Sequence, residues 1–169
     1  MATDEPVEPV PSLQDLSSAA KNLNKSTDEL VSLVDSLNKS FQAMNIGLYA
    51  SAEVCKWCSS EDARYEKEIL AYQKLNGAWT IAIRTEVGDE EDPIVEEKVT
   101  VWAFKDAPRD LRIRAVAKIP DLIKALTINA LDTTEQVNKA INNAKPYFEL
   151  SDGPPSRMSE AFKKAAERK

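Results

Sequence analysis

The sequence predicts an α+β fold: a long N-terminal helix, an antiparallel meander of about four strands, and C-terminal helices that pack with the first helix as a coiled-coil-like pair. Three observations predict it. Ten positions spaced alternately by three and four begin at Leu13, which is typical of a heptad helix. Asn76-Gly77 lies between two alternating runs, as in a β-hairpin. A second series with the heptad spacing begins at Ile119.

The N-terminal helix is predicted from its first heptad stripe, which we define as Leu13, Leu16, Ala20, Leu23, Thr27, Leu30, Val34, Leu37, Phe41 and Met44. Ser12 is the expected N-cap, and the helix extends to about Asn45, with Gly47 expected at C′, the first residue past the helix end. A break near Ser26–Glu29 is an alternative. We favour one helix of roughly 50 Å, because the stripe keeps its phase there.

The positions that flank the first heptad stripe carry no charge. They are Ser17, Asn24, Val31, Asn38 and Asn45 on one side, and Ala19, Ser26, Leu33, Ser40 and Gly47 on the other. A parallel zipper usually selects its partner through charges at these sites. Small and apolar flanks instead favour a helix that packs on two sides, as in a bundle or a hairpin.

The middle of the chain is predicted to be β. An Asn76-Gly77 turn pairs Lys74 with Trp79, Tyr72 with Ile81, and Leu70 with Ile83, all on one buried face. Residues 61–75 could instead be helical, but the hairpin explains more of the pattern. Residues 48–57 and 99–104 are the further expected strands. The seven acidic residues within 86–97 predict a solvated loop.

The C-terminal part is predicted to be helical. Asp106 is the expected cap of a helix with Pro108 in its first turn, and Pro120 should kink or restart it. A second heptad stripe follows, and Pro146 is expected to end it. Its members are Ile119, Ile123, Leu126, Ala130, Thr133, Val137, Ala140 and Ala144. We therefore predict a disordered acidic, proline-rich tail (1–12), one α+β domain (13–150), and a linker with a short basic tail (151–169).

Composition excludes several function classes. The chain of 169 residues has no histidine, so Ser-His-Asp and Cys-His catalysis are excluded within it. The formal net charge of −6 provides no long-range attraction to nucleic acid or anionic lipid. There is no apolar run that could span a bilayer and no secretory signal pattern, so we expect a cytoplasmic protein without a membrane partner.

Two short patterns contain residue types that occur in metal or redox sites. Cys55 and Cys58 fall in a predicted strand, where residues three apart face opposite sides, and the second cysteine pair of a zinc ribbon is missing. The acidic loop has no EF-hand spacing. We therefore predict no metal and no cofactor.

A basic stretch offers possible anion-binding residues, namely Arg109, Arg112 and Arg114, beside Lys105 and Lys118. Arg109 and Arg112 share a helical face. The simpler interpretation is that these side chains pair with carboxylates or face water.

We predict a non-enzymatic protein–protein interaction protein, such as an adaptor, an inhibitor or a complex subunit, that binds a protein partner or itself. Its expected interaction residues are Leu13, Leu16, Leu23, Leu30, Val34, Leu37, Phe41 and Met44. The alternative function is nucleic-acid or nucleotide binding through Arg109–Arg114, although nucleic acid is not the partner we favour. A histidine-free enzyme is the third and least favoured hypothesis.

Overall fold

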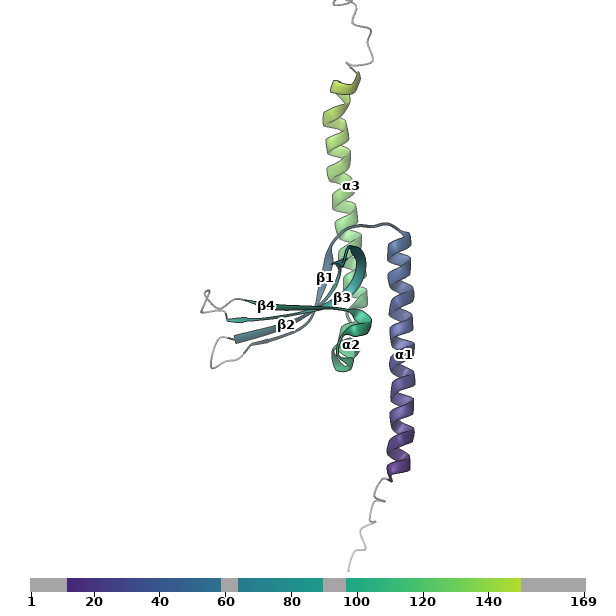
Figure 1. Ribbon diagram of the computed structural model, residues 1–169. Helices are drawn as coiled ribbons and strands as arrows, with labels where there is room; N and C mark the ends of the chain where they lie inside the picture. Colours follow the sequence, from purple (N-terminus) through teal and green to yellow (C-terminus); the bar gives the residue numbers. More distant parts are fainter. Residues whose placement is uncertain (1–11, 59–63, 90–96, 150–169) are drawn as a thin grey trace, which may run out of the picture. The chain divides into compact units, whose positions relative to one another are not determined.

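The computed structural model describes residues 12–58, 64–89 and 97–149. The chain divides into two compact units, residues 1–126 and 127–169. The elements are α1 (Leu13–Ala43), β1 (Ala50–Cys58), β2 (Arg64–Leu75), β3 (Ala78–Asp89), β4 (Lys98–Ala103), the 3₁₀ turn η1 (Phe104–Asp106), α2 (Arg109–Val116) and α3 (Ile119–Glu149) (Figure 1). The predicted α+β class, with a long first helix and a C-terminal helical part, is confirmed. The predicted tails, 1–12 and 151–169, lie almost wholly outside the described residues.

The four strands form one antiparallel sheet in the order β1-β2-β3-β4. Asn76 and Gly77 take the two positive φ angles of the predicted turn, 50° and 87°. The resulting register pairs Tyr72 with Ile81 and Leu70 with Ile83. The predicted register is therefore confirmed, including the pair Lys74–Trp79, but Lys74 is exposed and Trp79 half-buried, so the predicted buried face does not extend to the turn. A register shift between Glu53 and Cys55 interrupts the β1–β2 pairing.

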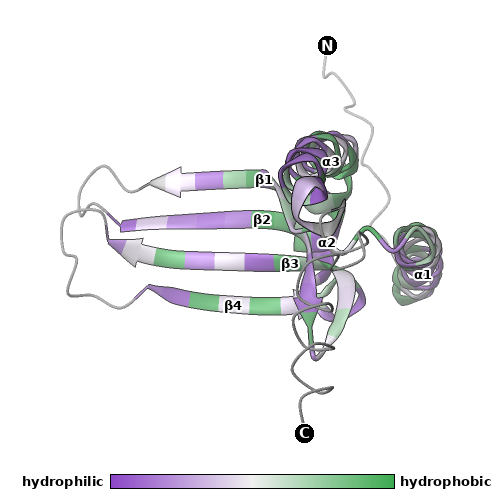
Figure 2. Ribbon diagram, turned by 90° about the horizontal axis from the view of Figure 1, so that it is seen from above, coloured by the Kyte–Doolittle hydropathy of each residue, from purple (hydrophilic) through white to green (hydrophobic). Residues whose placement is uncertain are grey.

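The core of the first unit lies on the face of the sheet that carries Leu70, Tyr72, Ile81 and Ile83. Buried residues of α1, α2 and the start of α3 complete it: Val34, Phe41, Leu111, Ala115, Leu122 and Leu126. Figure 2 shows hydrophobic residues where the strands approach α2 and mostly hydrophilic ones toward the other end of β2. The hydrophobic pattern of the strands thus marks the part of the sheet that the helices cover.

Ser12 caps α1 as predicted. Its hydroxyl accepts a hydrogen bond from the Asp15 backbone N–H (3.2 Å), and the Asp15 carboxylate accepts one from the Ser12 N–H (2.9 Å). The helix is continuous to Ala43, so the alternative break near Ser26 does not occur. The predicted C′ residue was wrong, because the helix ends earlier. Asn45, rather than Gly47, follows the Met44 cap with a positive φ of 51°.

Two predicted features of the C-terminal helices were also wrong. Asp106 does not cap α2, because it belongs to η1, and Ala107 is then extended (ψ 155°), as a residue before proline prefers. Pro108 is the N-cap. Pro120 does separate the helices, since α2 ends at Val116 and α3 begins at Ile119. Pro146 does not end α3, because three helical residues follow it. A proline this close to the helix end disrupts little of the helix.

Candidate interaction surface

Helix α1 is held against the sheet by two amide side chains one turn apart. Asn38 Oδ1 accepts a hydrogen bond from the backbone N–H of Ile81 (2.9 Å), and Gln42 Nε2 donates one to the carbonyl of Trp79 (2.8 Å). In the described residues, β4 pairs only with Ala82–Val87 of β3, so the start of β3 has no strand on that side. The two amides thus take the place of a neighbouring strand as hydrogen-bond partners of the Ile81 N–H and the Trp79 carbonyl.

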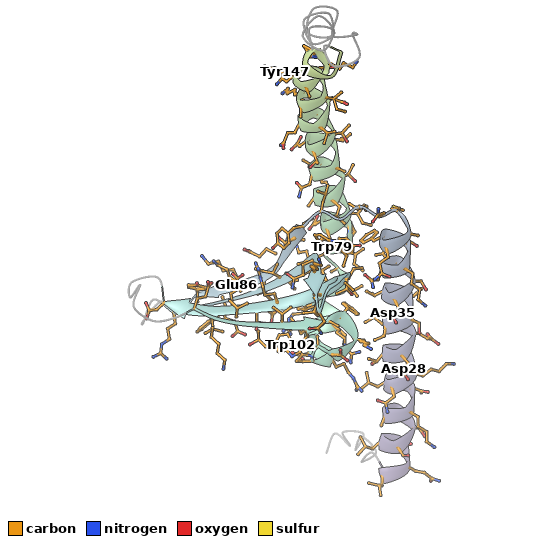
Figure 3. All side chains as sticks on the ribbon, turned by 45° about the horizontal axis from the view of Figure 1, so that its top comes forward. Asp28, Asp35, Trp79, Glu86, Trp102 and Tyr147 are labelled. Carbon is orange, nitrogen blue, oxygen red and sulfur yellow. The ribbon has the colours of Figure 1, made fainter. Side chains whose placement is uncertain are left out.

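The spacing explains why a helix can do this. Residues four apart on a helix rise about 6 Å, and residues two apart on a strand rise about 6.6 Å, so the two repeats match over one turn. Aromatic contacts reinforce the attachment. The Phe41 ring meets Tyr72 edge to face at 5.3 Å, and Tyr72 stacks on Trp79 at 5.5 Å. Figure 3 shows Trp79, at the start of β3, beside α1, and Glu86 farther along the sheet.

Only the C-terminal half of the first heptad stripe is covered. Thr27, Val34 and Phe41, which are seven residues apart, are buried. Leu30 and Leu37, which lie between them on the stripe, are half-buried. The buried members lie against the sheet and the residues after β4, where Val34 belongs to the same core cluster as Ile81 and Phe104. The predicted coiled-coil pairing of the two stripes is therefore not confirmed, because the sheet covers this part of the first stripe.

The N-terminal half of the same stripe is uncovered. Leu13, Leu16 and Leu23 are 83%, 64% and 48% exposed, and every residue from Ser12 to Ser26 is classed as exposed. At the next turn of the helix, Arg109 Nη2 donates a hydrogen bond to Asn24 Oδ1 (2.8 Å). We call Leu13, Leu16, Ala20 and Leu23 the free stripe. Met44, the last member of the first stripe, is also exposed.

The helical turns that carry the free stripe are poor in charge. Asp15 and Lys21 are the charged residues between Leu13 and Asn24. Hydrogen bonds from Ser12 hold the pKa of the Asp15 carboxyl below its ordinary value. The carboxylate also lies in the first turn, where the helix dipole favours negative charge. This end of α1 is thus a well-formed helix that exposes a leucine-rich stripe.

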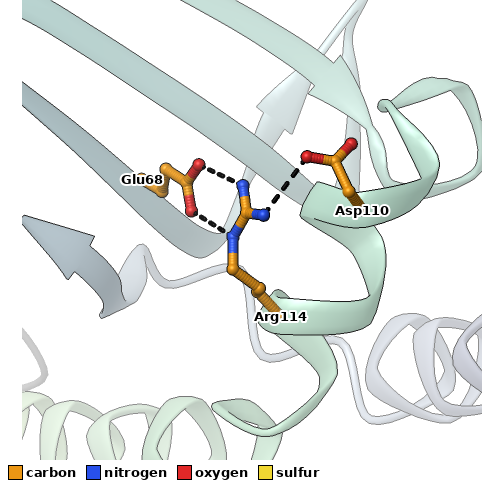
Figure 4. Close-up of polar contacts among 3 residues, drawn as sticks. All are labelled: Glu68, Asp110 and Arg114. Atoms are coloured by element: carbon orange, nitrogen blue, oxygen red, sulfur yellow. Dashed lines mark hydrogen bonds and ion pairs between the residues drawn. The ribbon is translucent and has the colours of Figure 1, made fainter.

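The three predicted anion-binding arginines differ in their contacts. Arg114 binds both carboxylate oxygens of Glu68 (3.0 and 2.5 Å) and also Asp110 (3.2 Å) (Figure 4). These contacts raise the Arg114 pKa. Its guanidinium is therefore occupied by a bidentate ion pair that joins α2 to β2. Arg109 donates a hydrogen bond to Asn24 of α1, and Arg112 Nε is buried without a hydrogen-bond partner among the described residues. Anion binding stays a prediction.

The other candidate features do not assemble into a chemical site. Cys55 is a free, exposed thiol on β1. In the described part of the chain, no three Cys, Asp or Glu side chains lie close enough to hold a metal ion. Residues 90–96 of the acidic loop lie outside the described part, and β3 extends to Asp89.

The second unit is described by α3 from Thr127 onward. None of its residues up to Tyr147 is classed as buried, and Val137 and Ile141 are 50% and 49% exposed. The second heptad stripe is thus buried at Leu126, within the first unit, and half-exposed or exposed beyond it. No helix among the described residues is both long and apolar enough to cross a membrane.

The heptad pattern predicts the whole first stripe as the contact surface and does not indicate the residues that cover part of it. Asn38 was recognised as an uncharged flanking residue, and its role as a strand-edge acceptor was not predicted. An Asn and a Gln four residues apart, beside buried stripe positions, are the signal that could have indicated it. Comparison of the chain with protein-family models, curated proteins and solved structures finds no match.

Proposed function

We propose that the protein is a non-enzymatic protein-interaction module, and that its contact surface is the free stripe of α1. The observation that carries this proposal is that one heptad stripe, in one phase, is buried or half-buried from Thr27 to Phe41 and exposed from Leu13 to Leu23. The buried half shows which face of the helix takes apolar contacts. An exposed continuation of the same face is the kind of apolar surface that marks protein interaction sites.

The polar surroundings support this function over the two alternatives. The free stripe lies among serine, asparagine and alanine residues that offer neither a nucleophile–base pair nor a cluster of cations. Of the predicted anion-binding arginines, Arg114 is bonded to two carboxylates and Arg109 donates a hydrogen bond to Asn24. Binding through apolar helix contacts uses the features that are present.

Paired substitutions on the two halves of the first stripe test the proposal. Leu23→Asp should leave the circular dichroism spectrum and the melting temperature nearly unchanged, and should abolish association with the partner. Leu37→Asp should destabilise the fold, because the half-buried Leu37 packs against the core. Ser18→Asp is the matched control, since it adds the same charge to the exposed side of the helix opposite the stripe.

The readout is affinity purification of each variant from the protein's own cells, followed by mass spectrometry, together with light scattering of the purified chain. Loss of an associated protein, or of self-association, in Leu23→Asp but not in Ser18→Asp is the expected result. If Leu23→Asp keeps every association of the wild-type chain, the free stripe is not the contact surface.

A further inference from the structure

We infer that the partner of the free stripe is the same segment of a second copy of this chain, packed antiparallel to form a two-fold symmetric dimer. This inference rests on the proposed function and names its partner. Three features support it: the order of large and small residues along the free stripe, the absence of charge on its flanks, and the intact helix end that carries it.

The free stripe is complementary to itself in one antiparallel register. With the two-fold axis at the level of Ser18, Leu13 of one copy meets Leu23 of the other, and Leu16 meets Ala20. Each layer then joins a first and a fourth heptad position, as antiparallel helix packing requires, and a large residue faces a small one in the two central layers. All four residues are exposed, so no contact with the sheet is broken.

The flanking residues favour an identical partner. In an antiparallel symmetric pair, the same flank of each helix meets its own copy, so a charge there would face an identical charge. The flanking positions beside the axis are Ser17 and Ala19, and neither is charged. A different partner is commonly selected by charges at these sites. Uncharged flanks remove the repulsion that opposes self-association.

The helix is preformed where the contact is made. The Ser12–Asp15 capping box fixes the first turn, and α1 continues without a break to the part attached to the sheet. Little helix ordering is therefore required on association. Three turns from each copy make a contact smaller than the roughly 1,200 Å² typical of stable complexes. We therefore expect a reversible dimer with a dissociation constant in the micromolar range.

Charge-swapped variants of the full-length chain provide the sharpest test, measured by sedimentation velocity over a concentration series. Wild type should shift from monomer to dimer as concentration rises. Ser17→Lys with Ala19→Lys, and Ser17→Glu with Ala19→Glu, should each weaken the dimer about ten-fold, because like charges then face each other. Mixing the two variants should restore association. Ser18→Lys, on the opposite side of the helix, is the matched control and should behave as wild type.

A cross-link tests the orientation. In a background in which Cys55 and Cys58 are replaced by serine, Ala19→Cys should form a disulfide dimer on mild oxidation, and Ser18→Cys should not. A parallel pair would place Ala19 opposite a different residue, so failure of Ala19→Cys to cross-link in a chain that still dimerises overturns the antiparallel register.

The outcomes separate this inference from the proposed function. If wild type stays monomeric at all concentrations, and Leu23→Asp nevertheless loses a protein captured from cells, the free stripe binds a different partner and the second-copy inference is wrong. If Leu23→Asp dimerises as well as wild type and also keeps every protein captured from cells, both proposals fail. A dimer that Leu23→Asp dissolves and that the mixed charge variants restore supports both.

Discussion

Replacing Asn38 with leucine separates two opposing effects on stability. Leucine is the better helix former, by roughly 0.5 kcal/mol, so helix propensity alone predicts a more stable protein. The substitution also removes the acceptor of the Ile81 N–H, which lies 2.9 Å from Asn38 Oδ1. A buried donor left without a partner costs about 1–3 kcal/mol. Because this bond is only partly buried, we use the lower half of that range.

The net expectation for Asn38→Leu is a loss of about 1 kcal/mol in the free energy of unfolding, which corresponds to roughly 2–4 °C in melting temperature for a chain of this size. Urea unfolding measures the free energy, and amide hydrogen exchange at Ile81 measures the local effect. The Ile81 amide should lose protection more than its neighbours in β3, because it alone loses its acceptor.

Two variants control the experiment. Asn22→Leu makes the same substitution on an exposed part of α1 that does not contact the sheet, so it reports propensity alone and should stabilise slightly. Asn38→Asp keeps an acceptor oxygen and should retain the protection of the Ile81 amide. If Asn38→Leu is as stable as Asn22→Leu and Ile81 stays protected, the side chain does not satisfy the strand edge and the reasoning is refuted.

Two further predictions concern local packing and pH. A Cβ at Gly88 would lie 2.7 Å from Tyr65 Oη, so Gly88→Ala should destabilise by about 1–2 kcal/mol in urea unfolding; an equal loss in a Tyr65→Ser background would contradict this cause. The pKa of Asp15 is lowered in the folded chain, so its capping contribution is present above the ordinary aspartate pKa and is lost as pH falls through the lowered value. Titration by NMR should place the midpoint below the ordinary range, and Ser12→Ala should raise it.

The hairpin was predictable because its determinants are local. Asn76-Gly77 fixes the turn, the turn fixes the register, and the alternation of Leu70 and Tyr72 fixes the buried face. The Ser12 cap was predictable for the same reason. Asp106 failed as a cap because a proline two residues on imposes an extended residue between them, and this constraint outweighed the capping preference.

The covering of the first stripe could not be predicted from its pattern. Heptad spacing states that one helix face is apolar and does not distinguish a second helix from a sheet as the covering element. Here the sheet covers Val34 and Phe41, a result that depends on β4 ending short of the start of β3. That length difference is set by the residues after β4, which turn into η1 at Phe104, far from the stripe in sequence.

The strand-edge attachment also accounts for why the free stripe stays free. The open part of β3 on this side is only Ala78–Ile81, and Asn38 and Gln42 each bind one of its backbone groups. Sliding α1 by one turn toward its C-terminus would bring Leu23 nearer the sheet, but Val34 would then replace Asn38 opposite the Ile81 N–H, which would lose its acceptor. The same two hydrogen bonds that stabilise the domain therefore fix how far the leucine-rich end of α1 extends beyond it. The Asn38→Leu variant thus removes one of the two hydrogen bonds that fix the position of α1, while leaving the residues of the free stripe unchanged.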